Sequence, residues 1–119
     1  MLLRHLALAV QDEQRSREFY ERWFGFGERP PRRYSDGVLM LYGPGDVALA
    51  LGPAQGPPEL PPFFHFGFAL DDPARVRELR AALEREGVEI VEAWEEDDYV
   101  SVKCRDPDGY VVEASWEPT

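Results

Sequence analysis

The sequence predicts an α+β fold of two βαβββ units, whose strands form a curved eight-stranded mixed sheet with the helices on its outer face. The stretches 5–10 and 65–70 both start with a histidine and alternate in side-chain size, and an aspartate that can begin a helix follows each histidine by seven residues. This echo at a sixty-residue offset indicates an internal duplication. After each predicted helix, turn residues divide the chain into three short strand patterns.

The first unit is predicted over residues 1–52. A strand over 2–10 leads to Asp12, a favourable N-cap. Aromatic residues then recur at helical spacing up to Phe24, and Gly25 is placed to end the helix. Three strands follow near 26–34, 37–43 and 46–52, separated by glycine-containing turns.

The second unit repeats this order over residues 63–117. A strand over 63–70 precedes Asp72 as the N-cap, with Pro73 at the first helical position and Gly87 as the stop. The remaining strands are predicted near 88–94, 98–105 and 109–116. Residues 53–62 contain five prolines and read as a semi-rigid linker. The prediction is thus a single domain, 1–119, made of two units.

Composition excludes several classes of function. The net charge of −10 makes nucleic acid and anionic membrane surfaces poor partners, because both attract basic patches. The chain has no apolar run close to the roughly 20 residues that a membrane span needs. With Cys104 as the one cysteine, no internal disulfide can form, so a cytoplasmic location is expected.

Alternation along the strands locates a pocket. Because successive residues point to opposite faces, His5 and Ala7 share one face of the first strand, and His65 and Gly67 share one face of the fifth. The small neighbours leave room that a packed core would fill. The last strand adds Glu113 inside an apolar run, and two histidines with one carboxylate are the ingredients of a metal site. Further pocket-lining candidates alternate on the seventh strand: Tyr99, Ser101 and Lys103.

These motifs resemble the vicinal oxygen chelate superfamily, which includes glyoxalase I, the fosfomycin-modifying thiol transferases, the bleomycin-resistance binding proteins and the extradiol dioxygenases. The resemblance spans nearly the whole chain. It rests on the His-x-x-Leu-x-Val pattern from His5 with a following aspartate, on Ser16-x-x-Phe19-Tyr20 and Gly25-Phe26, on His65, and on Asp106-Pro107-Asp108-Gly109-Tyr110-x-x-Glu113. The members share a scaffold and not a reaction.

The resemblance implies that His5, His65 and Glu113 bind one divalent metal ion. Glyoxalase I has a fourth protein ligand, and aligning the two final turns puts that position at Ala50, which cannot bind metal and lines the pocket instead. A four-ligand glyoxalase I is therefore not expected. A fosfomycin transferase is not expected either, because carboxylates fill the stretch 93–97 where a phosphonate needs donors. The ligand set suits Zn²⁺, Ni²⁺, Mn²⁺, Co²⁺ or Fe²⁺ alike.

Three functions stay open at this point. The first is a metal-dependent lyase or isomerase of glyoxalase type, which acts on a small oxygen-rich metabolite and uses Glu113 as ligand and proton shuttle. The second is a metal-free, bleomycin-resistance-like protein that sequesters a cationic small molecule. The third is a small dioxygenase. The resemblance also implies a homodimer, with the site built within one chain or shared across the two.

Overall fold

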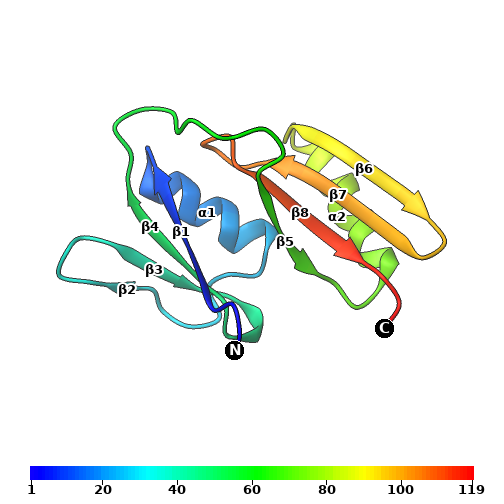
Figure 1. The fold of residues 1–119 in the computed structure, drawn as a ribbon, viewed down its shortest axis with the longest axis horizontal. Coiled ribbons are helices and arrows are strands. Elements are labelled where there is room, and N and C mark those ends of the chain that lie inside the picture. Colours follow the sequence, from blue (N-terminus) through cyan, green and yellow to red (C-terminus); the bar gives the residue numbers. More distant parts are fainter. The chain divides into compact units, whose positions relative to one another are not determined.

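The computed structural model covers residues 1–119, which divide into two compact units, Met1–Glu59 and Leu60–Thr119. Each unit has one long helix and four strands in the order βαβββ (Figure 1). The predicted α+β class and its two βαβββ units are thereby confirmed. The eight strands form one four-stranded mixed sheet in each unit. Neither helix is long and apolar enough to cross a membrane.

The first unit places its strands in the order β1-β4-β3-β2. Strand β1 runs parallel to β4, and the other neighbours are antiparallel. A single 3₁₀ turn, Pro44–Asp46, joins β3 to β4. The elements of this unit are β1 (His5–Val10), α1 (Glu13–Trp23), β2 (Arg32–Arg33), β3 (Leu39–Tyr42) and β4 (Ala48–Pro53).

Helix α1 begins and ends where the sequence predicts. The Asp12 side chain accepts a hydrogen bond of 3.1 Å from the Arg15 backbone N–H. Just past the helix, Gly25 has a φ of 72°, a left-handed conformation that glycine adopts without steric cost. The helix buries Ser16 and Tyr20 completely against its unit. The aromatic spacing therefore marked the core-facing side of this helix.

The predicted strand over 26–34 is wrong in extent, because β2 consists of Arg32–Arg33. Pro30 and Pro31 have no N–H to donate to a strand partner. The N–H of Phe26 bonds the Tyr20 carbonyl at 3.2 Å, so this residue continues the helix end. The hydrogen-bonding groups of a longer strand are thus either missing or already used.

The second unit has the same plan, with its strands in the order β5-β8-β7-β6. Strand β5 is parallel to β8, and β8, β7 and β6 are antiparallel neighbours. Its elements are β5 (His65–Ala69), α2 (Pro73–Arg85), β6 (Ile90–Glu96), β7 (Tyr99–Arg105) and β8 (Val111–Trp116). Strand β5 lies within the predicted strand 63–70 but starts two residues later, because Phe63 has a left-handed backbone with a φ of 70°.

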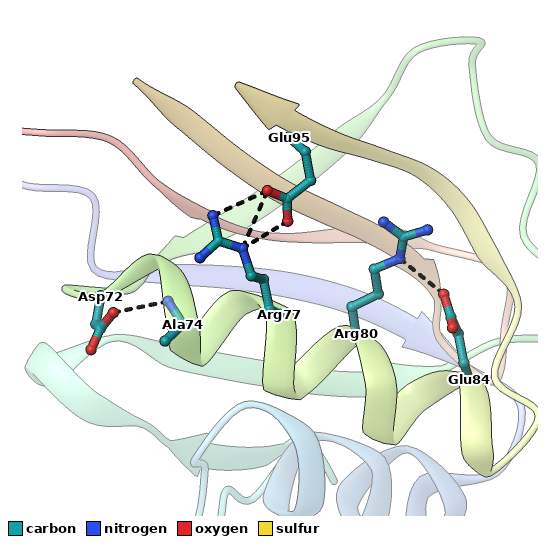
Figure 2. Close-up of polar contacts among 6 residues, drawn as sticks. All are labelled: Asp72, Ala74, Arg77, Arg80, Glu84 and Glu95. Carbon is teal, nitrogen blue, oxygen red and sulfur yellow. Dashed lines mark hydrogen bonds and ion pairs between the residues drawn. The ribbon is translucent and has the colours of Figure 1, made fainter. Parts of the chain in front are cut away.

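Helix α2 covers one face of the second sheet, where it contacts β7 and β8. Its N-cap Asp72 accepts a hydrogen bond of 2.8 Å from Ala74, and Arg77 on the same helix pairs with Glu95 of β6 at 2.9 Å (Figure 2). The buried residues of this layer are Val76, Leu83, Val100, Val102, Cys104, Val112 and Ala114. The predicted site residues of this unit lie on the opposite face of the sheet, which α2 does not cover.

Candidate functional site

The register of the second sheet aligns the predicted site residues on its helix-free face. Gly67 of β5 lies directly opposite Glu113 of β8, and Glu113 lies directly opposite Lys103 of β7. Directly paired residues of neighbouring strands share a face. Two residues further along β8, Ser115 is paired with Ser101 of β7. Within this unit, Gly67, Lys103 and Glu113 therefore share one face of the sheet, as the alternation of side chains along the strands predicts.

The turn between β7 and β8 fixes this register. Asp106 Oδ1 accepts hydrogen bonds from the backbone N–H groups of Asp108 at 2.9 Å and Tyr110 at 3.0 Å. Gly109 has a φ of 93°, a backbone conformation that residues with a side chain rarely adopt. A one-residue slip here would turn Glu113 toward the helix. The Asp-Pro-Asp-Gly motif thus positions the carboxylate without touching it.

Glu113 is 8% exposed, and two hydroxyl groups hold one of its carboxylate oxygens. Tyr99 and Ser101 each donate a hydrogen bond of 2.5 Å to Oε2. Both hydroxyl groups therefore converge on a single carboxylate oxygen. The other oxygen, Oε1, lies 3.5 Å from Nε2 of His65. The carboxylate is oriented so that a single oxygen faces the histidine.

His65 is oriented through its second ring nitrogen. Nδ1 lies 2.8 Å from the backbone carbonyl oxygen of Phe63. A carbonyl can accept but cannot donate, so Nδ1 carries the proton of this hydrogen bond. In neutral His65, Nε2 then presents a lone pair toward Glu113 Oε1. Two lone pairs 3.5 Å apart repel unless a proton or a cation lies between them.

Gly67 is required by the position of Glu113. A Cβ at residue 67 would lie 3.1 Å from both Cβ and the carbonyl oxygen of Glu113. Such contacts are tighter than nine in ten real Cβ contacts, so the neighbour would have to shift. The small residue that the sequence places near His65 thus makes room for the backbone and Cβ of Glu113.

Burial, and then the hydrogen bond to the Glu113 carboxylate, raise the pKa of the Tyr99 phenol above its usual range. Tyr99 therefore stays a neutral hydroxyl at physiological pH and continues to donate to Glu113. Ser101, which is 2% exposed, is the second neutral donor to the same carboxylate.

Within the first unit, His5 is exposed at the start of β1. Ala7 and Ala50 lie directly opposite each other on β1 and β4, and both line a cavity of about 200 Å³. Ala7 and Ala50 are paired as Gly67 and Glu113 are in the second unit. Ala50 therefore occupies in its unit the place that Glu113 occupies in the other.

Neither unit contains three or more histidine, cysteine or carboxylate side chains grouped so that they could hold a metal ion. The second unit brings two metal-ligating side chains together, those of His65 and Glu113. Lys103 does not join this pair, because its Nζ bonds Glu92 of β6 at 3.1 Å. The roles of His5, His65 and Glu113 as metal ligands accordingly remain predictions.

Three residues near this site were missed from the sequence. Phe63 acts through its backbone carbonyl, which no side-chain pattern can reveal. Trp94 is 45% exposed and lies opposite Ser101 on the site face of β6, and its strand period could have been used to find it. Glu92 is the partner of Lys103, and the same period places it on this face.

Comparisons with known proteins define the class. A sequence model of the Glyoxalase/Bleomycin resistance protein/Dioxygenase superfamily matches residues 2–114. The chain therefore belongs to this superfamily, as the motifs implied. No curated protein sequence matches it significantly.

Solved structures share the fold across almost the whole chain. A fosfomycin resistance protein from Listeria monocytogenes is 17% identical with a TM-score of 0.79, covering 99% of this chain and 94% of its own. A lactoylglutathione lyase from Agrobacterium tumefaciens is 23% identical with a TM-score of 0.72, covering 97% and 92%. An antibiotic binding protein from a Streptomyces species is 22% identical with a TM-score of 0.73, covering 99% and 97%. At these identities the likeness establishes the fold alone.

Proposed function

We propose that this chain is a metal-dependent enzyme of glyoxalase type, which acts on a small oxygen-rich metabolite by lyase, isomerase or epimerase chemistry. One observation carries the proposal. The Phe63 carbonyl holds the proton of His65 on Nδ1, while Nε2 and Glu113 Oε1 face each other at 3.5 Å. Metal-binding histidines characteristically donate their other N–H to a carbonyl or carboxylate in this way.

The separation of these two atoms fits a shared divalent cation. Two ligands that each bind a metal at about 2.0–2.2 Å lie roughly 3–3.5 Å apart. His65 and Glu113 would hold the ion from the second unit, and His5 is proposed from the family motif as the third ligand. Zn²⁺, Ni²⁺, Mn²⁺, Co²⁺ and Fe²⁺ all accept such ligands. When bound, the metal supplies polarisation of a substrate carbonyl or enediolate oxygen.

The remaining residues orient and serve the carboxylate. Tyr99 and Ser101 hold Oε2 of Glu113, so Oε1 would be the oxygen that binds the metal and, when released from it, takes or gives a proton. Ala50 adds no fourth protein ligand, and coordination positions stay open for a substrate's two oxygens. The reaction of a four-ligand glyoxalase I is therefore not part of this proposal, and nor is that of a fosfomycin transferase.

The proposal includes a homodimer that binds its small-molecule substrate in a reducing cytoplasm. Each four-stranded sheet has outer strands with a neighbour on one side only, and such edges need covering. Light scattering at micromolar concentration should give twice the chain mass. A monomer under these conditions would remove the dimer from the proposal.

Calorimetric metal titration tests the proposed function. His65→Ala and Glu113→Gln should each weaken binding strongly, because each removes a ligand while the rest of the face is unchanged. Glu95→Gln is the matched control, since it neutralises a glutamate of the same sheet that bonds Arg77 on the helix side (Figure 2). This exposed pair contributes little to stability.

Equal metal affinity in Glu113→Gln and the parent would contradict the proposal, and the metal-free binding-protein hypothesis would then replace it. A protein that retains Fe²⁺ in preference to the other metals would favour the small-dioxygenase alternative. If Glu95→Gln lost as much metal affinity as Glu113→Gln, the titration would be measuring the protein's overall negative charge and not binding at this site.

A further inference from the structure

A cavity of about 260 Å³ lies beside His65 in the second unit. One part of its wall is apolar and includes Phe63, Phe64, Val91 and Val111, and another carries the cations Lys103 and Arg105. Its volume is slightly below the range of about 300–1,000 Å³ for drug-sized ligands, so it suits a smaller molecule. His65 is the residue that this cavity shares with the proposed metal site.

Lys103 is the less exposed of the two cations that line the cavity. Its side chain is 12% exposed, whereas that of its partner Glu92 is 40% exposed. Nζ has three N–H donors and uses one for Glu92, at 3.1 Å. The ammonium also lies 5.7 Å from the centre of the Phe63 ring. Because Lys103 is paired with Glu113 across one strand spacing of about 4.8 Å, an anchored ligand could reach both groups.

Two irregular backbone positions border the same cavity. Phe63 has a φ of 70°, a left-handed backbone that is unfavourable for a residue with a side chain, and its ring is left exposed (86%). On β6, Val91 is the extra residue of a bulge between Ile90 and Glu92. Bulges re-aim a side chain next to binding sites, and strained positions concentrate there. Both irregularities present an apolar side chain to the cavity.

The geometry points to a binding site for a small aromatic or apolar carboxylate, with Lys103 as the anchor of the carboxylate and Phe63 as the surface under its apolar body. As a statement about the substrate of the proposed enzyme, this inference rests on the proposed function. The carboxylate would hydrogen-bond the Lys103 donors that face the cavity. The exposed Phe63 ring would lose its contact with water on binding, a favourable change for a large apolar side chain.

A single negative charge is favoured over a phosphate. Arg105 already bonds Glu89 at 2.7 Å and the Gly109 carbonyl at 3.0 Å, which leaves Lys103 as the main anchor. A dianion would bring a second charge with no cation to match it, next to Glu92. The apolar wall likewise excludes a fully polar ligand.

Three probe molecules distinguish the contribution of the ligand's negative charge from that of its aromatic ring. Binding of each is measured by chemical-shift titration of the ¹⁵N-labelled full chain. Benzoate has both features, acetate has the charge alone, and benzylamine has a similar ring with the opposite charge. Benzoate should bind most tightly and shift the amide signals of Phe63, Val91 and Lys103. Benzylamine binding as tightly as benzoate would overturn the inference, and so would the absence of any benzoate binding.

Two variants test the named residues. Lys103→Met keeps the stem and removes the charge, and it should weaken benzoate binding about ten- to a hundredfold, the effect of a hydrogen bond to a charged group. Arg80→Met is the control, because it removes one exposed cation from α2 on the other side of the sheet (Figure 2). Phe63→Gly suits the left-handed backbone, so it should fold well while binding benzoate about tenfold more weakly.

Metal titration of the same proteins separates this inference from the proposed function. Lys103→Met keeps both proposed ligands of the second unit and removes a positive charge beside Glu113, so it should bind metal at least as tightly as the parent. Benzoate binding that depends on Lys103 in a protein without metal affinity would support the cavity and refute the enzyme. Benzoate affinity that is equal in Lys103→Met and the parent would overturn the cavity assignment whatever the metal result.

Discussion

The hydrogen bond from Tyr99 to Glu113 gives a quantitative prediction for the site. Tyr99→Phe removes the hydroxyl that donates to Oε2 at 2.5 Å and leaves the ring in place. Because the acceptor is an ionised carboxylate that is 8% exposed, the lost bond should cost about 1.5–3 kcal/mol in the free energy of unfolding. Ser101 continues to donate to the same oxygen, so the lower part of this range is expected.

A double-mutant cycle isolates this bond from other effects of the substitution. Urea denaturation of metal-free parent, Tyr99→Phe, Glu113→Gln and the double variant gives the coupling free energy between the two residues. Glu113→Gln removes the charge that makes the bond strong, so Tyr99→Phe should cost much less in that background. A coupling below about 0.5 kcal/mol would refute the argument that Tyr99 orients the carboxylate.

Two further predictions concern the neighbouring strands. Burial, and then the charge of Asp106, raise the pKa of the Cys104 thiol to about 12, whereas an unfolded thiol ionises near 8.5. The folded state therefore keeps its proton at pH values where the unfolded state loses it, and stability falls as the pH rises from about 8.5 toward 12. The stability difference between the parent and Cys104→Ala should shrink by on the order of 1–2 kcal/mol between pH 8 and pH 10, as measured by urea denaturation, and a constant difference would count against this. Gly67→Ala should displace Glu113 and weaken calorimetric metal binding about 10- to 100-fold, while Gly52→Ala, whose added Cβ meets nothing within 4 Å and whose φ is not positive, should leave the affinity unchanged. Unchanged affinity in Gly67→Ala would mean that the crowding is relieved without moving the carboxylate.

Local signals made most of the fold predictable. Asp12 and Asp72 both cap a helix as expected, since a short side chain with an oxygen satisfies the first free N–H groups. The strand period also placed Tyr99 and Ser101 on the face of Glu113, where both turn out to bond it. These inferences hold because periodicity and capping depend on neighbouring residues.

Features set by tertiary contacts could not be predicted in the same way. Nothing in the sequence marks Phe63 for a left-handed backbone, because glycine or asparagine is the usual signal. The bulge at Val91 likewise leaves no local pattern. The overlong strand predicted over 26–34 is a different case, because Pro30 and Pro31 are visible in the sequence and lack the donors that a strand needs. Phe63 and Val91 both border the cavity beside His65, where local preference and global structure often disagree.

The position of the proton on the His65 ring is the most direct test of the proposed metal site at His65 and Glu113. Long-range ¹H–¹⁵N spectra of the imidazole ring report which nitrogen carries the proton. We expect a proton on Nδ1, bonded to the Phe63 carbonyl, and an unprotonated Nε2 whose signal moves when one equivalent of Zn²⁺ is added. A proton on Nε2 of neutral His65, or a ring whose signals ignore Zn²⁺, would contradict a metal site at His65 and Glu113.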